Sequence, residues 1–268
     1  FAQNDEEACE LFINKHGNDF LMRSAGEWYR RDGFRYTLMD PKEAEMSLWK
    51  CLKEMKIHTH DKKGNPKLLA GQSSVKSSIM KDIVRSWEIK NMNFDNPGWL
   101  FFINGGWKFV ESKFYNSSEL VKMGIHTDVW VDLEYTEDGM AEKLDYWTNM
   151  ACSILRSESN VFLEDMACII SGLYPQKYIR QVIGGRDSGK STLMLSIVNA
   201  LGAYAGTFKG MDLDGSRAES TERQLGFLLS APRARLRLSD ETPDKPLNGG
   251  LVKMLTGGYR GEVRQAYG

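Results

Sequence analysis

Apolar and polar positions in the first part of the chain alternate between helical and strand spacing. Apolar residues recur on one helical face between residues 4 and 17, behind an acidic run that suits a helix N-terminus, and they predict a short opening helix. The stretch 20–37 is rich in aromatic residues and contains Asp32-Gly33, a dipeptide typical of tight hairpin turns. We therefore expect two strands joined by a turn after the first helix.

The next segments predict two further helices and a second hairpin. Asp40, Pro41 and Glu43 supply an N-cap, a first-position proline and a capping-box glutamate for a helix whose apolar residues recur as far as position 55. Residues 75–87 carry apolar side chains at helical spacing and predict a third helix. Residues 99–110 are typical of two strands joined across an Asn-Gly-Gly turn.

The second half of the chain predicts an α/β arrangement. Helical spacing of apolar residues runs through 144–155 and again through 162–170. A β-branched run at 178–183 then predicts a strand. Residues 136–139 are the most plausible linker between this half and the mixed helices and strands before it.

Residues 184–192 read Gly-Gly-Arg-Asp-Ser-Gly-Lys-Ser-Thr and fit the phosphate-binding pattern G-x-x-x-x-G-K-[ST]. Glycines let backbone N–H groups approach the phosphates of ATP, and the helix that is expected to follow offers its positive N-terminal end. Lys190 is expected to reach the β- and γ-phosphates, and the Ser191 hydroxyl to ligate Mg²⁺. The residues expected to bind the nucleotide are Gly184, Gly185, Ser188, Gly189, Lys190, Ser191 and Thr192.

A second, acidic element is needed to hold the metal and to orient the attacking water. Residues 234–239 predict a strand that ends in Asp240 and Glu241. We expect Asp240 to lie in the outer shell of Mg²⁺ and Glu241 to polarise water, so that Lys190, Asp240 and Glu241 form the catalytic set. Two arginines interrupt the apolar pattern that is usual in a parallel strand, so an edge strand followed by a solvated acidic turn is the alternative.

Composition and charge exclude several classes of protein. With 41% apolar and 26% charged residues, the 268-residue chain is typical of a folded protein and not of a disordered or fibrous one. No apolar stretch approaches the roughly 18–20 residues that cross a bilayer, and no signal-peptide pattern is present, so we expect an intracellular protein without a membrane partner. The net charge of −1 requires that any nucleic-acid site be local.

The four cysteines lie far apart and form no Cys-x-x-Cys unit, so we expect reduced, mostly buried thiols. Cys51, His58 and His60 are candidate zinc ligands. They lack a fourth ligand at a recognised spacing, which disfavours a zinc site.

In this order, the elements resemble the poxvirus-type primase-helicases and their phage and plasmid relatives, which are superfamily 3 helicases of the AAA+ class. The resemblance is carried by the flanks of the phosphate loop, the acidic strand, a Lys-x-Leu-Thr-Gly-Gly signature and an Asn-Pro-Gly-Trp motif; these stretches are 168–174, 199–204, 235–242, 251–264 and 96–99. It implies an α/β fold in which a P-loop AAA+ ATPase domain at 139–268, incomplete at its C-terminus, follows a smaller mixed α+β accessory domain at 1–138.

The resemblance also implies an activity and partners. Helicases of this family hydrolyse ATP with Mg²⁺ to translocate on single-stranded DNA as hexameric rings, in the host cytoplasm or at a site of viral or phage DNA replication. A primase or polymerase domain can belong to the same chain, and a sensor residue and an arginine finger are expected beyond Gly268. Hairpins that line the channel contact the DNA backbone, and Lys253, Arg260 and Arg264 are the matching candidates here. Basic residues outnumber acidic ones by seven to four between 233 and 268, which supplies the local positive charge.

Two other classes of function remain open from the sequence. A small-molecule P-loop kinase would need a lid and an acceptor site near the loop, and no motif marks them. A nucleotide-gated module that loads DNA or organises partners without processive unwinding would suit the N-terminal region, in which we find no chemistry of its own.

Overall fold

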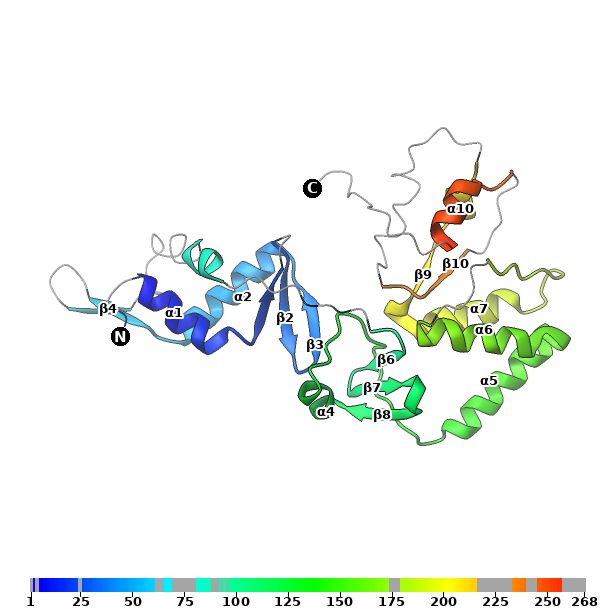
Figure 1. Ribbon diagram of the computed structural model, residues 1–268, viewed down its shortest axis with the longest axis horizontal. Helices are drawn as coiled ribbons and strands as arrows, with labels where there is room; N and C mark the ends of the chain where they lie inside the picture. The colour runs from blue at the N-terminus through cyan, green and yellow to red at the C-terminus, as the bar shows by residue number, and fades with distance from the viewer. Residues whose placement is uncertain are drawn as a thin grey trace. The chain divides into compact units, whose positions relative to one another are not determined.

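The computed structural model describes a mixed α/β protein with small sheets, divided into two compact units (Figure 1). One unit comprises residues 1–95 and 118–128, and the other comprises 96–117 and 129–268. This division does not coincide with the boundary predicted at 138/139, which stays a prediction. The residues described are 2, 5–23, 26–60, 65–68, 81–87, 92, 94, 96–173, 179–215, 233–239 and 245–256.

The first unit combines a three-stranded antiparallel sheet with helices. Its elements are α1 (Asp5–His16), β1 (Phe20–Met22), β2 (Trp28–Asp32), β3 (Arg35–Leu38), α2 (Pro41–Glu54), β4 (His58–His60), β5 (Pro66–Leu68) and a helical segment at 81–86. The sheet order is β1-β2-β3, and β4 pairs with β5. The helices predicted at 4–17 and from Pro41 are confirmed. The helix predicted at 75–87 is present in its described part, and its residues before 81 lie outside the described residues.

The hairpin predicted around Asp32-Gly33 is present, with its turn displaced by one residue. Asp32 pairs with Arg35, so Gly33 and Phe34 form the loop, and Gly33 has the positive φ of +61° that the first position of a II′ turn requires. The sheet also has a third strand, β1, because Phe20 to Met22 pair with β2.

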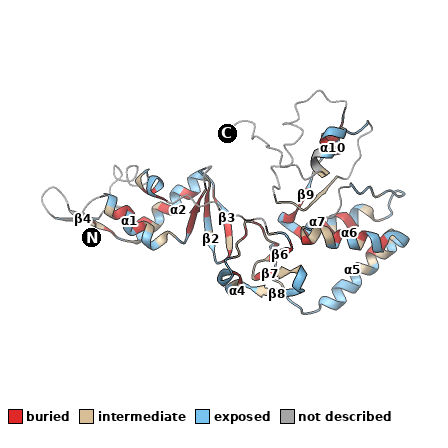
Figure 2. Ribbon diagram, viewed as in Figure 1, coloured by how far each residue is buried: buried red, intermediate tan, exposed pale blue. Residues whose placement is uncertain are grey.

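Capping residues stabilise the N-terminus of α2, and the buried face of this helix packs on the core. The Asp40 side chain accepts a hydrogen bond from the Lys42 backbone N–H at 2.9 Å, and Pro41 occupies the first helical position. Leu48 and Leu52 are fully buried among the aromatic residues of the unit. Figure 2 shows buried and exposed residues alternating along α1 and α2, as expected of helices with one face on a core.

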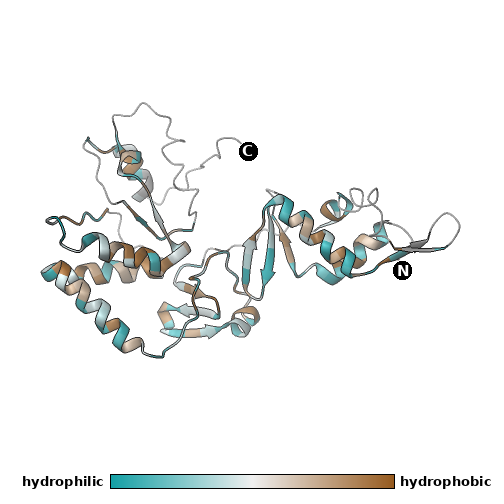
Figure 3. Ribbon diagram, turned by 180° about the vertical axis from the view of Figure 1, so that it is seen from behind, coloured by the Kyte–Doolittle hydropathy of each residue, from teal (hydrophilic) through white to brown (hydrophobic). Residues whose placement is uncertain are grey.

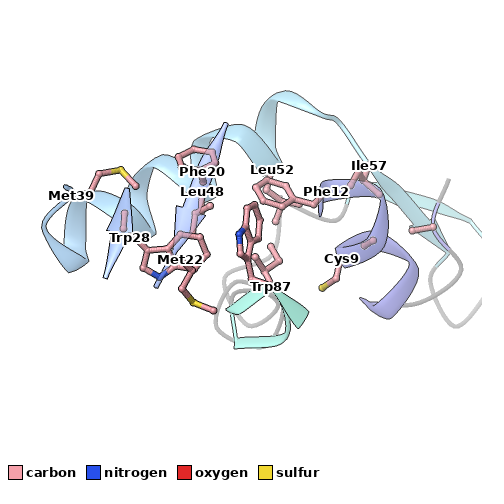
Figure 4. Close-up of a cluster of buried hydrophobic side chains, with 14 residues drawn as sticks. Cys9, Phe12, Phe20, Met22, Trp28, Met39, Leu48, Leu52, Ile57 and Trp87 are labelled. Atoms are coloured by element: carbon pink, nitrogen blue, oxygen red, sulfur yellow. The ribbon is translucent and has the colours of Figure 1, made fainter. Parts of the chain in front are cut away.

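Trp87 lies at the centre of this core (Figure 4). Its ring is 5.1 Å from the ring of Trp28, 6.1 Å from that of Phe12 and 6.3 Å from that of Phe20. Phe12 comes from α1 and Trp28 from the sheet, so one tryptophan joins elements that are far apart in sequence. Trp87 is itself 6% exposed and therefore belongs to the core of this unit.

The second unit combines another antiparallel sheet with three long helices and a parallel strand pair. Its elements are β6 (Trp99–Phe102), β7 (Gly105–Lys108), β8 (Lys113–Asn116), α5 (Met140–Leu155), α6 (Ser159–Ser171), α7 (Lys190–Leu201), β9 (Ala205–Thr207), β10 (Leu236–Leu238) and α10 (Gly249–Thr256). The short helix α4 (Ser117–Lys122) follows β8 and, after its first residue, belongs to the first unit. The helices predicted at 144–155, at 162–170 and after the glycine loop are confirmed. Figure 3 shows hydrophobic residues along α6 and α7.

The hairpin predicted at 99–110 is confirmed, and its glycines lie in a strand. Phe102 pairs with Gly105, so the turn precedes the glycines, and β8 adds a third strand. A Cβ atom on Gly105 would lie 2.2 Å from the backbone oxygen of Tyr115. Only glycine lets β7 and β8 approach so closely.

The strand predicted at 178–183 is wrong for its described part. Residues 179–183 have no regular secondary structure, and 178 lies outside the described residues. Ile179 is 50% exposed and Ile183 is 83% exposed, while Arg180 forms an ion pair with Asp165 of α6. Preference for strands reflects fit to a half-buried sheet surface. These side chains do not meet such a surface here, and an ion pair to a helix holds the segment instead.

The strand predicted at 234–239 is confirmed as β10, which pairs in parallel with β9. Both strands pack against α7. This arrangement joins the helix that follows the glycine loop to the strand that leads toward the acidic pair. Within the described residues, no helix has both the length and the apolar character needed to span a bilayer.

Candidate nucleotide-binding site

The glycine loop leads directly into α7, which begins at Lys190. Gly189 precedes the helix with a φ of +83°, and Asp187 has a φ of +58°. Ser191 and Thr192 are exposed in the first turn, where backbone N–H groups have no acceptor within the helix. The loop therefore offers N–H donors and the positive end of a helix to an anion.

Lys190 folds back over the loop and binds its oxygen atoms. Its Nζ donates to the carbonyl oxygens of Gly185 at 2.7 Å and Gly184 at 3.0 Å, and to Oγ of Ser188 at 2.9 Å. These hydrogen bonds hold the ammonium group against the loop, next to the start of α7. A phosphate that binds at this helix end would meet the lysine charge together with the backbone donors.

Helix α5 holds the loop in place from one side. A Cβ atom on Gly189 would lie 3.0 Å from Cδ1 of Ile154, so this position requires glycine for space as well as for its positive φ. Further along the two helices, Nε1 of Trp147 donates to Oγ of Ser196 at 3.3 Å. The position of the loop thus depends on α5 as well as on its own sequence.

A cavity of about 600 Å³ opens beside the loop. It is bounded by the end of α5, the start of α6, the segment 180–183 and the loop itself. Ser188 and Lys190 line it at the loop side. Its volume lies within the range of roughly 300–1,000 Å³ that small-molecule sites occupy.

Two of the described residues that line the cavity, Asp165 and Arg180, form an ion pair. Nε of Arg180 donates to Oδ2 of Asp165, whose side chain is only 9% exposed. No sequence motif predicts either residue as part of a site. A signal was present, since Asp165 interrupts the apolar face that Phe162 and Met166 form on the same helix.

The predicted acidic pair, Asp240 and Glu241, lies outside the described residues, although β10 ends shortly before it in sequence. The arginines that precede the pair are engaged within the unit. Arg235 donates to the backbone oxygens of Ile170 and Trp99 and lies over the ring of Tyr204. Burial lowers the pKa of Arg237.

One of the three predicted DNA-contacting residues is described. Lys253 is exposed on α10, whose start is capped by Asn248: its Oδ1 accepts from the N–H groups of Gly250 and Leu251, both at 3.1 Å. Leu251 is 3% exposed, so α10 packs by an apolar side and leaves Lys253 accessible. Arg260 and Arg264 lie outside the described residues.

No zinc cluster is found among the described side chains, where three or more potential metal ligands nowhere come together. This does not extend to the His60 side chain, which is not described. Of the residues predicted for the nucleotide, the structure thus brings together the loop residues from Gly184 to Thr192 and adds the cavity beside them. Comparison of the chain with protein-family models and with curated proteins finds no match.

Proposed function

We propose that this protein binds and hydrolyses ATP at the loop 184–192, as the motor of a superfamily 3 DNA helicase. The observation that carries the proposal is the position of Lys190. Its Nζ is held by three oxygens of the loop at the start of α7, beside a cavity large enough for a nucleoside. A lysine and a helix N-terminus that converge on a glycine loop suit a polyphosphate.

Some residues of the proposed site would bind the nucleotide, and others would act in hydrolysis. The loop N–H groups and Lys190 would bind the β- and γ-phosphates and stabilise the charge that develops on them during transfer. Ser191 and Asp240 would hold Mg²⁺, which supplies further positive charge to the phosphates when bound. The carboxylate of Glu241 would orient water in line with the γ-phosphate.

The motor function rests on the family resemblance together with the exposed lysine on α10. Lys253, Arg260 and Arg264 would hold the phosphates of single-stranded DNA without reading its bases, as a translocating hexameric ring requires. Phosphate contacts of this kind make binding salt-dependent. Each lost contact should lower the salt slope of binding to single strands by about 0.7.

Lys190→Ala tests the nucleotide site most directly. Removing a charged donor to phosphate is expected to weaken binding of a fluorescent ATP analogue by about 10- to 150-fold. The fold should persist, because the lysine contacts only exposed loop atoms. Lys143→Ala, at an exposed lysine of α5, is the matched control and should leave affinity unchanged. Equal affinities in the wild type and Lys190→Ala would disprove the site.

Glu241→Gln separates hydrolysis from binding. The variant should bind the ATP analogue normally and release phosphate much more slowly, because it keeps the side-chain shape and loses the carboxylate. A strand-separation assay then distinguishes a helicase from an assembly module, and phosphate transfer to a metabolite would indicate a kinase.

A further inference from the structure

Among the described residues that line the cavity, Asp165 and Arg180 form an ion pair away from the loop and the α5–α6 turn. Asp165 comes from α6 and its side chain is 9% exposed, while the Arg180 side chain is 49% exposed. The lining of the cavity also includes apolar side chains, among them Ile154, Phe162 and Val182. Burying a carboxylate is costly unless it is paired, so the guanidinium of Arg180 stabilises the buried charge of Asp165.

This pair presents a hydrogen-bond acceptor beside a donor. The carboxylate accepts from N–H groups, and the guanidinium donates through several N–H groups in one plane. The amino-bearing edge of adenine has the complementary order, an amino donor next to a ring nitrogen acceptor. The apolar side chains of the lining suit the faces of a flat ring.

The phosphate loop and the pair belong to the same cavity. Ser188 and Lys190 line it at one side, and Asp165 and Arg180 line it as well, so one molecule can contact both. A triphosphate at the loop therefore places its nucleoside toward the pair.

We propose that Asp165 and Arg180 select the base of the nucleotide, a role that rests on the proposed function of the loop. Asp165 accepts a hydrogen bond from the exocyclic amino group, and Arg180 donates to the neighbouring ring nitrogen. The pair is thus a specificity determinant of the site, and it favours nucleotides with an amino group on this edge of the base.

The test compares three probes that differ only in what they offer the pair. ATP carries the amino group, purine riboside 5′-triphosphate lacks it and keeps the ring nitrogen, and inorganic tripolyphosphate has no base. Binding of each, with Mg²⁺, is measured by calorimetry or by displacement of a fluorescent analogue. The wild type should bind ATP at least about 10-fold more tightly than purine riboside triphosphate, as expected for a hydrogen bond to a charged group.

The two variants should respond differently. Asp165→Asn should reduce the preference for ATP to about 3-fold or less, because a neutral amide is the weaker acceptor. Arg180→Gln should weaken ATP and purine riboside triphosphate together, since both carry the ring nitrogen. Tripolyphosphate should bind all three proteins equally. A purely structural role would instead weaken every probe, tripolyphosphate included, and would overturn the inference.

Failure of this inference is distinguishable from failure of the proposed function. If Lys190→Ala weakens tripolyphosphate and the preference for ATP is the same in Asp165→Asn as in the wild type, the loop binds phosphate and the pair does not read the base. If Lys190→Ala leaves tripolyphosphate unaffected, the proposed site itself is wrong. Should Asp165→Asn not fold, as judged by circular dichroism, Arg180→Gln at the half-exposed partner decides the question: unchanged affinity for both nucleotides would overturn the inference.

Discussion

The hydroxyl group of Tyr204 is expected to contribute measurably to the stability of the unit that carries the glycine loop. Tyr204 follows α7 and is 1% exposed. Its hydroxyl donates to the backbone oxygen of Val129 at 3.1 Å and accepts from the backbone N–H of Phe101 at 3.3 Å. Tyr204→Phe keeps the ring and removes both hydrogen bonds from backbone groups of buried residues.

The size of the effect follows from these two contacts. A buried polar group that loses its partner costs about 1–3 kcal/mol, and the longer of the two bonds contributes least, so we expect a loss of about 2 kcal/mol in the free energy of unfolding. For a unit of this size that corresponds to roughly 4–8 °C in melting temperature. Chemical denaturation measures the loss, and hydrogen exchange of the Phe101 amide locates it.

Tyr146→Phe is the matched control, because that tyrosine is 74% exposed on α5 and its hydroxyl should be dispensable. Surface substitutions typically change the free energy of unfolding by less than about 0.5 kcal/mol. A change of that size in Tyr204→Phe, with hydrogen exchange of the Phe101 amide as slow as in the wild type, would show that the hydroxyl does not stabilise this unit.

Three further outcomes are expected. Gly105→Ala should lower the free energy of unfolding, measured by denaturant titration, by about 2 kcal/mol or more, because the new Cβ would lie 2.2 Å from a backbone oxygen of β8. Gly249→Ala is the control and should leave the free energy of unfolding unchanged, because there is open space around Gly249. Burial and a neighbouring arginine lower the pKa of His126 below 6.5 in the folded protein. The unfolded chain therefore binds the proton more readily, and the free energy of unfolding should fall as the pH drops from about 7 to 5. His126→Gln should make the free energy of unfolding less dependent on pH over this range. Asparagine and glycine both tolerate the φ of +58° at Asp187, and either substitution removes a negative charge from the loop. Asp187→Asn and Asp187→Gly should therefore each bind triphosphate about 2- to 5-fold more tightly at low salt, and added salt should reduce this difference in affinity. Unchanged affinity in both Asp187 variants would show that this exposed carboxylate does not act on the phosphates.

The features that the sequence predicts well are those whose causes lie within a few residues. Asp40 caps α2 through the backbone two residues on, and α7 follows from its own apolar spacing. The glycine loop belongs to the same class, since Gly184 to Lys190 lie close in sequence and bind one another. Such features need no knowledge of the rest of the fold.

The features that the sequence does not predict depend on partners far away in the chain. Residues 179–183 have a strand-like composition, yet Arg180 is held by Asp165, a residue of the preceding helix. The third strands β1 and β8 were missed for the same reason, because pairing is decided by the neighbouring strand and not by three or four residues of sequence. The cavity likewise exists only once α5 and α6 lie against the loop.

Arg235 is a residue whose role depends on partners that are distant in sequence. In sequence it interrupts an apolar strand and adds to a basic region that suits DNA. In the structure its guanidinium donates to the Trp99 oxygen at 2.5 Å and lies 4.5 Å from the centroid of the Tyr204 ring. Its charge is therefore used to fix the start of β10 against β6. Because β10 leads toward Asp240, the sheet that begins at Trp99 helps to position the strand on which the proposed hydrolysis depends, although the sequence assigned that sheet to the accessory domain.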